Sequence, residues 1–564
     1  MTGIPVRDTK FAKWLDEDAW MERMTGPKWS AVLNEEATLV KSYTNKPEVK
    51  KFIKESAEFY KKYDGLVILY NTDNLVIEQV NNFFKRWWFQ SLPNDRHDSR
   101  DVIESNNCAY STVDIKDGQE YFELQKWSGN NLEFKFSPVG PDIAIVNKTL
   151  YYLGVKNKLQ YYELWQCDLS GKNRKCIYRE KSPEVNLALH RLDDGRVLLS
   201  TENSQEFTYY SLPDLKKTSK YSNKADWAWK SMNLIITKSH GKKILYRGSK
   251  KLIEIEAGQI LVDPYAVHLG KKQCSIYVIT PTETSKYNLT SNTLIPQDSI
   301  KDDLTMKRIK GVSTDGTIVY GILTYKHKPK HLFAIGYGAY GMESNTGPVN
   351  TRWGPLVNND WAILYTFIRG GGDHDEAWAK AGRVDGRHKT IQDFEALVRS
   401  TQNIMNIKPS NTVIYGRSAG GLLMGGCLVN HPHGSLMTGV YAEVPYVDEL
   451  RTTTNADLPL TNLEHNEFGN PTQRLEDFIS VALLSPADTA LILKTPDIFV
   501  LTRTAEFDSQ VFAYEPVKWI RRLRQGGGQK LCIVEKDQGH FTPPDTTMQQ
   551  WATDCALINF MVLR

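Results

Sequence analysis

A serine with the surroundings of a catalytic nucleophile lies in the stretch YGRSAGGLLMGGC, residues 415–427. Its centre, GRSAG, matches the pattern G-x-S-x-G, follows the strand-like TVIY and opens the helix-like GLLMGGC. In this context the pattern holds the serine in a strained turn and exposes its hydroxyl. We therefore predict that Ser418 is a nucleophile. The alternative is a tight turn without chemistry.

A serine hydroxyl needs a neighbouring base, and the base needs a group that orients it. His540 lies in KDQGHF just after the strand-like KLCIVE and is the only histidine after His465. Asp508 follows closely after the strand-like DIFVLTRT, whereas Asp497 precedes that strand and would lie at its other edge. We predict that His540 is the base and that Asp508 orients it. The alternative for His540 is a histidine of a surface loop.

The oxyanion of an acyl-transfer intermediate needs hydrogen-bond donors. One expected donor is the backbone N–H of Ala419, immediately after the nucleophile. A second candidate is the phenol of Tyr337, which lies between two glycines in HLFAIGYGAYG. From these residues alone, Tyr337 is equally plausible as a packing residue.

The strand and helix context of these residues is that of an α/β domain. The second half of the chain has the alternation of strand-like and helix-like segments that such a domain needs. After about residue 300, apolar runs alternate with helix-length segments, which predicts a mostly parallel sheet with helices on both faces. The runs are HLFAIGYG, WAILYTFI, NTVIYG, GVYAEV, DIFVLT and KLCIVEK, and the segments include TIQDFEALVRSTQNI, GGLLMGGCLVN, VFAYEPVKWIRRLRQ and MQQWATDCALINFMV.

The first half has two different textures. Residues 1 to about 60 show helical spacing in WLDEDAWMERM, WSAVLNEEATLVKSY and PEVKKFIKESAEFYKKY. From about residue 65 to 296, short alternating runs broken by turn chemistry predict many antiparallel strands. A sandwich pair and a β-propeller both fit. At roughly 40 to 45 residues per blade, a propeller would have five or six blades, but no internal repeat is visible.

Composition excludes several classes of protein. The 564 residues carry 70 Lys plus Arg against 66 Asp plus Glu, which gives no electrostatic argument for a nucleic-acid partner. The seven cysteines are scattered without CxxC spacing, so we expect reduced thiols and no zinc or other cofactor. The N-terminus has no apolar core of signal-peptide length, and no segment is apolar enough to span a membrane. We therefore expect a cytoplasmic protein.

The motifs together resemble the prolyl oligopeptidase family, in wording closest to its oligopeptidase B branch. They occur in the order GYGAYG, IRGGGDHDEAWAKAG, GRSAGGLLMG, EVPYVDELRTT, LPLT, EFGNP, DSQVFAYEPVKW and GHF. The resemblance implies an α/β-hydrolase domain at 299–564, a β-propeller at 63–298 that admits only short peptides, and an N-terminal helical segment at 1–62 that packs on the hydrolase. It also implies a triad of Ser418, Asp508 and His540, with Tyr337 in the oxyanion hole.

The chain departs from the family pattern at positions that bind substrate. The family has arginine two residues after the aspartate, where this chain has Gln510. Of two acids that select basic side chains in the oligopeptidase B branch, Glu464 is kept and the other is Asn466. Further acids expected after GYGAYG are replaced by neutral residues, with Glu343 nearby as a possible substitute. A single carboxylate can hold Arg or Lys, although Glu464 could also be an ordinary surface acid.

We expect a serine peptidase that cleaves short peptides after Arg or Lys through an acyl-enzyme, as a monomer or weak homo-oligomer. One alternative is a broader acyl hydrolase or peptide transacylase, because the same acyl-enzyme can react with an amine if water is excluded. The other is a propeller protein that binds partners and no longer turns over peptides.

Overall fold

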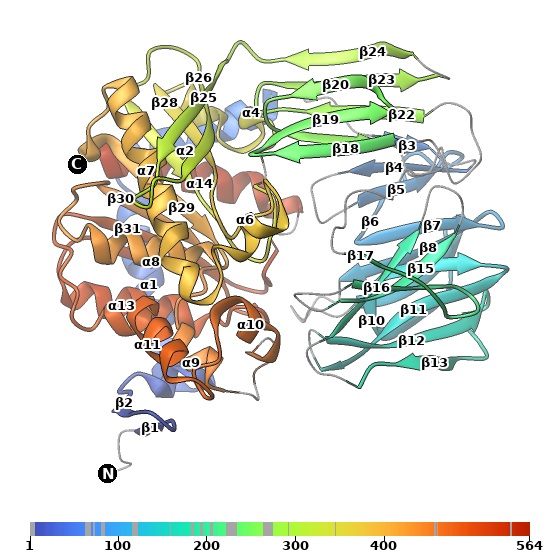
Figure 1. Ribbon diagram of the computed structural model, residues 1–564, viewed down its shortest axis with the longest axis horizontal. Helices are drawn as coiled ribbons and strands as arrows, with labels where there is room; N and C mark the ends of the chain where they lie inside the picture. Colours follow the sequence, from blue (N-terminus) through green and yellow to red (C-terminus); the bar gives the residue numbers. More distant parts are fainter. Residues whose placement is uncertain are drawn as a thin grey trace.

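The structure of the chain is a computed structural model. It describes residues 6–62, 69–71, 74–79, 85–114, 122–157, 160–181, 185–191, 196–202, 207–221, 234–262, 274–290, 293–344, 346–455, 458, 461–541 and 544–563. Helices mixed with one large sheet lie on the left of Figure 1, and a column of antiparallel sheets lies on the right. We call these two parts the hydrolase domain and the β-domain.

The hydrolase domain is built on a sheet whose described strands follow the order β25-β26-β28-β27-β29-β30-β31-β32. β25 and β26 pair antiparallel, and from β28 to β32 every neighbouring pair is parallel. Each apolar run predicted as a parallel strand is one, from β27 to β32. The strands are β25 (Thr305–Val312), β26 (Ile318–Tyr325), β27 (His331–Ile335), β28 (Trp361–Phe367), β29 (Thr412–Arg417), β30 (Gly439–Glu443), β31 (Phe499–Ala505) and β32 (Lys530–Glu535).

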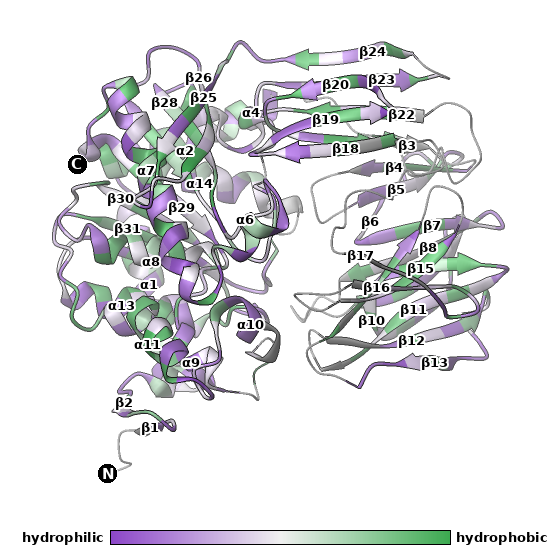
Figure 2. Ribbon diagram, viewed as in Figure 1, coloured by the Kyte–Doolittle hydropathy of each residue, from purple (hydrophilic) through white to green (hydrophobic). Residues whose placement is uncertain are grey.

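Helices cover both faces of this sheet, each over its own apolar core. One core joins the sheet to α1 (Pro27–Thr44), α7 (Arg387–Met405), α8 (Gly420–Asn430) and α13 (Tyr514–Gln525). The other joins it to α2 (Pro47–Lys62), α5 (Gly354–Val357) and α14 (Pro544–Leu563). The central strands are largely apolar because both of their faces are covered, and green marks their apolar residues in Figure 2. α4 (Val349–Arg352) and α6 (Glu376–Lys380) lie in the connections.

Between β30 and β31 the chain leaves the sheet in a run of short helices that the sequence analysis did not predict. They are α9 (Glu449–Thr453), α10 (Thr461–Phe468), α11 (Leu475–Leu484) and α12 (Pro486–Thr489). Segments this short give too few turns for an apolar period to stand out. They lie beside the carboxyl ends of the strands, so they contribute to the site described below.

The N-terminal segment packs against the hydrolase domain through buried charges. Lys518 of α13 binds both Asp16 (2.9 Å) and Asp448 (2.8 Å), and Arg522 binds Asp16 (2.8 Å) and Asp18 (2.7 Å). Burial disfavours ionisation of Asp16, but the charges of Lys518, Arg522 and Arg7 outweigh it and hold the pKa of Asp16 below its usual range.

These ion pairs explain one wrong prediction. The stretch WLDEDAWMERM was expected to be a helix, whereas β2 (Lys13–Leu15) pairs with β1 (Val6–Asp8) and is followed by the short 3-10 helix η1 (Ala19–Arg23). Non-helical backbone between β2 and η1 carries Asp16, whose side chain lies against α13. Tertiary charge pairing here overrides the apolar spacing.

The β-domain consists of successive antiparallel sheets. Within the described ranges they are β3 (Leu69–Asn71), β4 (Leu75–Gln79), β5 (Lys85–Phe89) and β6 (His97–Ser99); β7 (Asp101–Ser105), β8 (Cys108–Asp114), β9 (Phe122–Ser128), β10 (Asn131–Val146), β11 (Thr149–Asn157), β12 (Gln160–Asp168) and β13 (Lys175–Arg179); β14 (Asn186–Arg191), β15 (Val197–Glu202), β16 (Phe207–Ser211) and β17 (Lys216–Tyr221); β18 (Leu234–Ser239), β19 (Lys242–Arg247) and β20 (Lys250–Ile255); and β21 (Gln259–Val262), β22 (Cys274–Ile279), β23 (Glu283–Leu289) and β24 (Leu294–Lys301).

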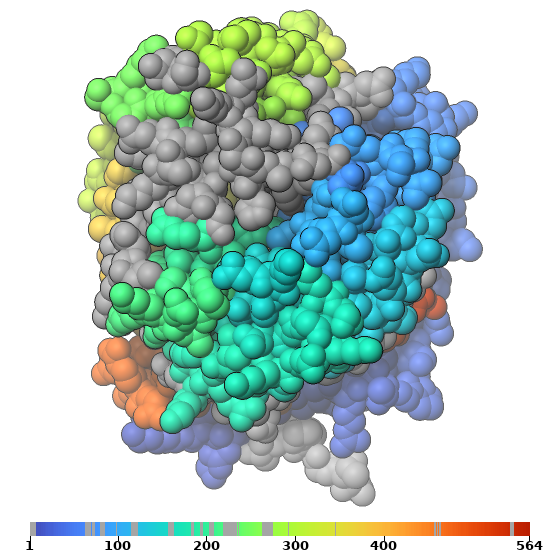
Figure 3. Space-filling view, turned by 90° about the vertical axis from the view of Figure 1, so that its right-hand side faces the viewer, coloured from blue at the N-terminus to red at the C-terminus, as the bar shows by residue number. Residues whose placement is uncertain are grey.

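Each of these sheets joins neighbours along the chain. The largest is two meanders that share β10, whose first part pairs with β9 and whose last part pairs with β11. The arrangement is propeller-like, and in Figure 3 the β-domain lies in front of the hydrolase domain. None of the described helices is long and apolar enough to cross a membrane.

The tip of the β18–β19 hairpin holds the two domains together. The N–H of Gly241 donates to the carbonyl of Asp373 (3.0 Å), and the ring of His240 stacks on His374 with centroids 3.9 Å apart. Beside it, Lys238 and Lys243 bind the two carboxylate oxygens of Glu343 at 2.9 and 2.5 Å. The β-domain is thus tied to the loop that follows GYGAYG.

Candidate active site

Ser418 occupies a strained turn between β29 and α8. Its φ of +54° lies in the left-handed region that residues with a side chain rarely adopt. Three backbone hydrogen bonds fix the turn: the N–H of Ser418 donates to Glu443 (2.9 Å), and its carbonyl accepts from Gly421 (2.8 Å) and Tyr446 (2.9 Å). Ser418 remains partly exposed, so its hydroxyl can be reached.

The glycines around Ser418 lie where neighbouring atoms leave no room for a side chain. A Cβ on Gly416 would lie 2.4 Å from the carbonyl oxygen of Gly420, inside the turn itself. On α8, a Cβ would lie 2.7 Å from Pro445 at Gly421, 2.3 Å from Pro486 at Gly425 and 2.3 Å from Ile391 at Gly426. The glycine-rich stretch therefore lets α8 approach its neighbours more closely than a side chain would allow.

His540 and Asp508 form a buried pair at the same edge of the sheet. Asp508 follows β31 and His540 follows β32, so both lie beyond the carboxyl ends of parallel strands. Nδ1 of His540 lies 2.7 Å from Oδ2 of Asp508, and the two residues are only 3% and 2% exposed. The other carboxylate oxygen accepts from the N–H groups of Gln510 (2.9 Å) and Val511 (2.8 Å). With Nδ1 donating to Asp508, Nε2 of His540 is left as the nitrogen that could accept a proton, as the predicted base requires.

Arg417 connects the turn of Ser418 to the loop of His540. Its guanidinium donates to the carbonyl of His540, lies 3.6 Å from the carboxylate of Glu443 and stands 5.3 Å from the ring centre of Phe541. Glu443 is also bound by Arg352 (2.8 Å). The backbone carbonyl of Glu443 also accepts the N–H of Ser418. One network of Arg352, Glu443 and Arg417 therefore supports the backbone at both Ser418 and His540.

Tyr337 lies beside the start of α8, two residues after β27. A Cβ on Gly420 would touch the Tyr337 ring at 3.7 Å. Burial raises the pKa of Tyr337 to about 12, so its phenol keeps the proton that a donor needs at neutral pH. The Tyr337 hydroxyl lies 3.7 Å from the sulfur of Met342, to which it donates. Ala419 is the residue immediately before α8, at the helix end whose N–H groups have no partner within the helix.

Glu464 lies on α10 and is 5% exposed, which is too buried for an ordinary surface acid. One of its oxygens accepts from the hydroxyl of Tyr446 at 3.2 Å. Burial raises the pKa of Glu464 to about 7. A buried carboxyl of this kind is stabilised in its ionised form by a cation that comes within contact distance.

The other predicted substrate contacts lie in different surroundings. Asn466 is half-buried on α10, two residues from Glu464, a spacing that puts side chains on different sides of a helix. Gln510 lies beside Asp508 through its backbone. Glu343 is bound to Lys238 and Lys243 of the β-domain, so a substrate contact would require it to release these lysines.

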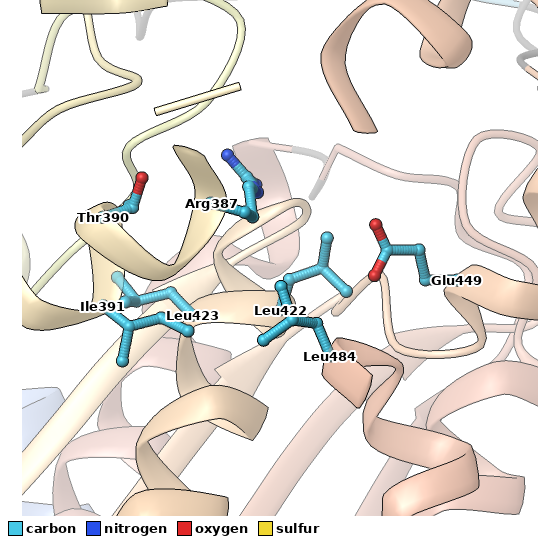
Figure 4. A pocket seen from close by; sticks show the side chains of 7 residues that line it. All are labelled: Arg387, Thr390, Ile391, Leu422, Leu423, Glu449 and Leu484. Atoms are coloured by element: carbon cyan, nitrogen blue, oxygen red, sulfur yellow. The ribbon is translucent and has the colours of Figure 1, made fainter. Parts of the chain in front are cut away.

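A small cavity lies under α8 behind these groups (Figure 4). It is lined by Arg387, Thr390, Ile391, Leu422, Leu423, Glu449 and Leu484, and its volume of about 10 Å³ is near the minimum for one water molecule. Burial raises the pKa of Glu449 to about 8, against the opposing charge of Arg387.

Comparisons with known proteins agree with this geometry. Residues 349–559 match the prolyl oligopeptidase family. This match covers most of the hydrolase domain, which is therefore similar to that family. Protease 2 of Moraxella lacunata is 31% identical over 235 residues, which cover 41% of this chain and 33% of that protein. Human prolyl endopeptidase-like is 31% identical over 216 residues, 36% of this chain and 29% of that protein. The matches thus span about a third of these relatives.

Solved prolyl oligopeptidase structures match the fold of the whole chain. Oligopeptidase B from Leishmania major superposes with a TM-score of 0.82 at 16% identity and covers 100% of this chain and 99% of its own. Oligopeptidase B from Trypanosoma brucei, in a closed form with covalently bound antipain, has the same TM-score at 17% identity, with 98% and 95% covered. The shared fold is a hydrolase domain with a propeller-like β-domain.

Several residues around the site were not predicted from the sequence. Arg417 contacts His540 and Tyr446 contacts Glu464, whereas Glu467 contacts Tyr340 in the loop after Tyr337. Glu467 lies three residues after Glu464 and therefore on the same side of α10. A prediction of α10 as a helix would have shown this.

Proposed function

We propose that the protein is a serine peptidase that hydrolyses short peptides after Arg or Lys. The observation that carries the proposal is the buried His540–Asp508 pair at 2.7 Å, on a loop tied by Arg417 to the turn of Ser418. Beside a strained, accessible serine, such a pair can take the proton of the serine hydroxyl. The family match over residues 349–559 supports the same reaction class.

In the proposed mechanism, Oγ of Ser418 attacks the carbonyl carbon of the scissile bond while Nε2 of His540 takes its proton. Tyr337 and the N–H of Ala419 donate to the oxyanion. His540 then gives its proton to the leaving amine, the C–N bond breaks and an acyl-enzyme remains. Water, deprotonated by His540, attacks the acyl carbon and releases the acid and the free serine.

The proposed substrate preference rests on Glu464, whose buried carboxylate would bind the cationic side chain before the scissile bond. We further propose that residues 63–298 form a propeller that restricts access, that residues 299–564 form the catalytic domain, and that residues 1–62 brace it. A neutral Gln510 in place of arginine would weaken the hold on the substrate backbone, because charge-assisted hydrogen bonds are the stronger ones.

Three substrates test the proposal: an arginyl amide, a matched neutral amide and a simple ester. We expect the wild type to favour the arginyl amide. Ser418→Ala should lower kcat on it roughly 10⁴-fold or more, and Glu464→Gln should remove most of the preference while ester hydrolysis persists. Equal rates on all three substrates would replace the peptidase by a broad acyl hydrolase. No turnover of any would favour a binding protein.

A further inference from the structure

Arg387 is a buried arginine next to the loop that carries Tyr337. It is the first residue of α7 and is 5% exposed. Its Nη1 donates to the carbonyl of Gly338 (2.9 Å), immediately after Tyr337, and lies 3.4 Å from the carbonyl of Gly382. Gly338 has a φ of +65° and packs tightly, since a Cβ there would lie 2.4 Å from Thr390. Arg387 therefore fixes the peptide that follows the oxyanion tyrosine.

Glu467 holds the same loop from the side of α10. It is 2% exposed, and one oxygen accepts the N–H of Tyr340 at 2.8 Å. That oxygen lies 3.6 Å from Nη1 of Arg387, and the other lies 2.8 Å from Nε of Arg383. Burial raises the pKa of Glu467, and the two arginines oppose the shift. Arg387 and Glu467 thus bind the loop at Gly338 and Tyr340, on both sides of Ala339.

Aromatic packing extends this contact towards Glu464. The Arg387 guanidinium stands 4.7 Å from the ring centre of Phe468, the last residue of α10. The Phe468 ring lies 5.3 Å from that of Tyr446, which donates to Glu464, and 5.5 Å from that of Tyr340. Arg387, Glu464 and Phe468 are buried, so the two charges act with little solvent screening.

The small cavity borders Arg387 on its other side. Its lining includes Leu422 and Leu423 of α8, four and five residues after the nucleophile, and Glu449, whose Oε2 has no hydrogen-bond partner among the described residues (Figure 4). Arg387 therefore lies between a carboxyl of α9 and a carboxylate of α10, with the oxyanion loop in front of it.

We propose that Arg387 and Glu467 are positioning residues that hold the oxyanion tyrosine in register with the helix that selects the substrate. A substrate side chain bound at Glu464 fixes the position of α10. The contacts of Arg387 and Glu467 with the loop then transmit that position to Tyr337. The inference rests on the proposed peptidase function and deepens it. It predicts that this pair affects the rate of acylation rather than the binding of substrate.

A double-mutant cycle tests the coupling. Arg387→Lys keeps the charge but shortens the reach to Gly338, and we expect kcat on the arginyl amide to fall roughly 10- to 100-fold, as small misplacements do, with KM little changed. Tyr337→Phe should lower kcat roughly 10²- to 10³-fold, as loss of one oxyanion donor does. If Arg387 acts through Tyr337, the double variant should be little worse than Tyr337→Phe alone.

Control variants separate positioning from folding. Arg522→Lys changes a similarly buried arginine on α13 whose side chain binds Asp16 and Asp18 of the N-terminal segment, and it should lower the midpoint of thermal unfolding but leave kcat unchanged. If Arg387→Lys fails to fold, Glu467→Gln replaces it in the same cycle, since its amide oxygen can still accept the Tyr340 N–H. Multiplicative loss in the double variant, or a loss confined to KM, would overturn the inference. An inactive wild type would instead overturn the proposed function.

Discussion

The raised pKa of the buried carboxyl group of Glu464 should make the choice of substrate depend on pH. Glu464 has its pKa raised to about 7 by burial, and only its ionised form attracts a cationic side chain. Raising the pH through 7 should therefore strengthen recognition of Arg and Lys, whereas lowering it should protonate Glu464 and weaken recognition. The direction follows from desolvation alone.

The prediction is made for a ratio of two substrates, because any pH effect that both substrates share cancels in the ratio. Between pH 6 and 8, kcat/KM for the arginyl amide divided by that for the neutral amide should rise about tenfold, in line with the ionised fraction of an acid with a pKa near 7. Glu464→Gln should make the ratio independent of pH. A ratio that stays flat in the wild type would mean that Glu464 does not bind the substrate side chain.

At the scale of secondary structure, the N-terminal segment is held to α13 by ion pairs whose loss has a defined cost. Asp16→Asn leaves Lys518 and Arg522 buried with one carboxylate fewer. Removing one partner of a buried pair costs roughly 3 to 5 kcal/mol, so the urea midpoint should fall clearly at pH 7. The pKa of Asp16 is lowered in the folded state, so its stabilisation is present above the unfolded pKa and is lost as the pH falls below about 4.

Glu55→Gln is the matched control, because Glu55 makes only an exposed pair with Lys51 at 3.8 Å. Its midpoint should equal that of the wild type. If the two variants unfold at the same urea concentration, the buried ion pairs do not brace the N-terminal segment.

The elements themselves show what sequence reasoning reaches. The strands β27 to β32 were predicted because continuous apolar runs of that length are typical of parallel strands that are buried on both faces in an α/β protein. α8 was predicted from residue 420 to residue 430 of the glycine-rich stretch. The helix over WLDEDAWMERM was wrong because Asp16 is held by residues some 500 positions away in the chain. α10 was missed because eight residues are too few for a clear period.

The same limit applies to the site. Ser418, Asp508 and His540 could be chosen because each follows a recognisable strand, and parallel strands end at one edge. The roles of Arg387 and Glu467 could not be predicted, because they depend on contacts with the backbone at Gly338 and Tyr340, and residue spacing does not indicate such contacts.

At the scale of the whole molecule, the β-domain controls access if its contacts with the hydrolase domain hold. Burial disfavours the charge on Glu343, but Lys243 and Lys238 outweigh it and lower the pKa of this carboxyl. Glu343→Gln removes that attraction at the edge of the interface. We expect the domains to separate more readily, so that peptides of about 30 residues gain in kcat/KM relative to a tripeptide amide, by a few-fold for a partly exposed pair.

The control for that variant is Glu254→Gln. Glu254 binds Lys242 and Lys251, both within the β-domain. It should leave the ratio of long to short substrates unchanged. A similar gain in both variants would show that general loosening of the β-domain, rather than the Glu343 contact, governs access.

The central claim is that Ser418 is a nucleophile activated by His540 and Asp508, and active-site labelling tests it most directly. The wild type is treated with a fluorophosphonate, and the adduct is located by peptide mass mapping. We predict one adduct, on Ser418, that is absent in Ser418→Ala and forms far more slowly in His540→Ala. Absence of an adduct in the wild type, or an adduct that persists in Ser418→Ala, would contradict the claim.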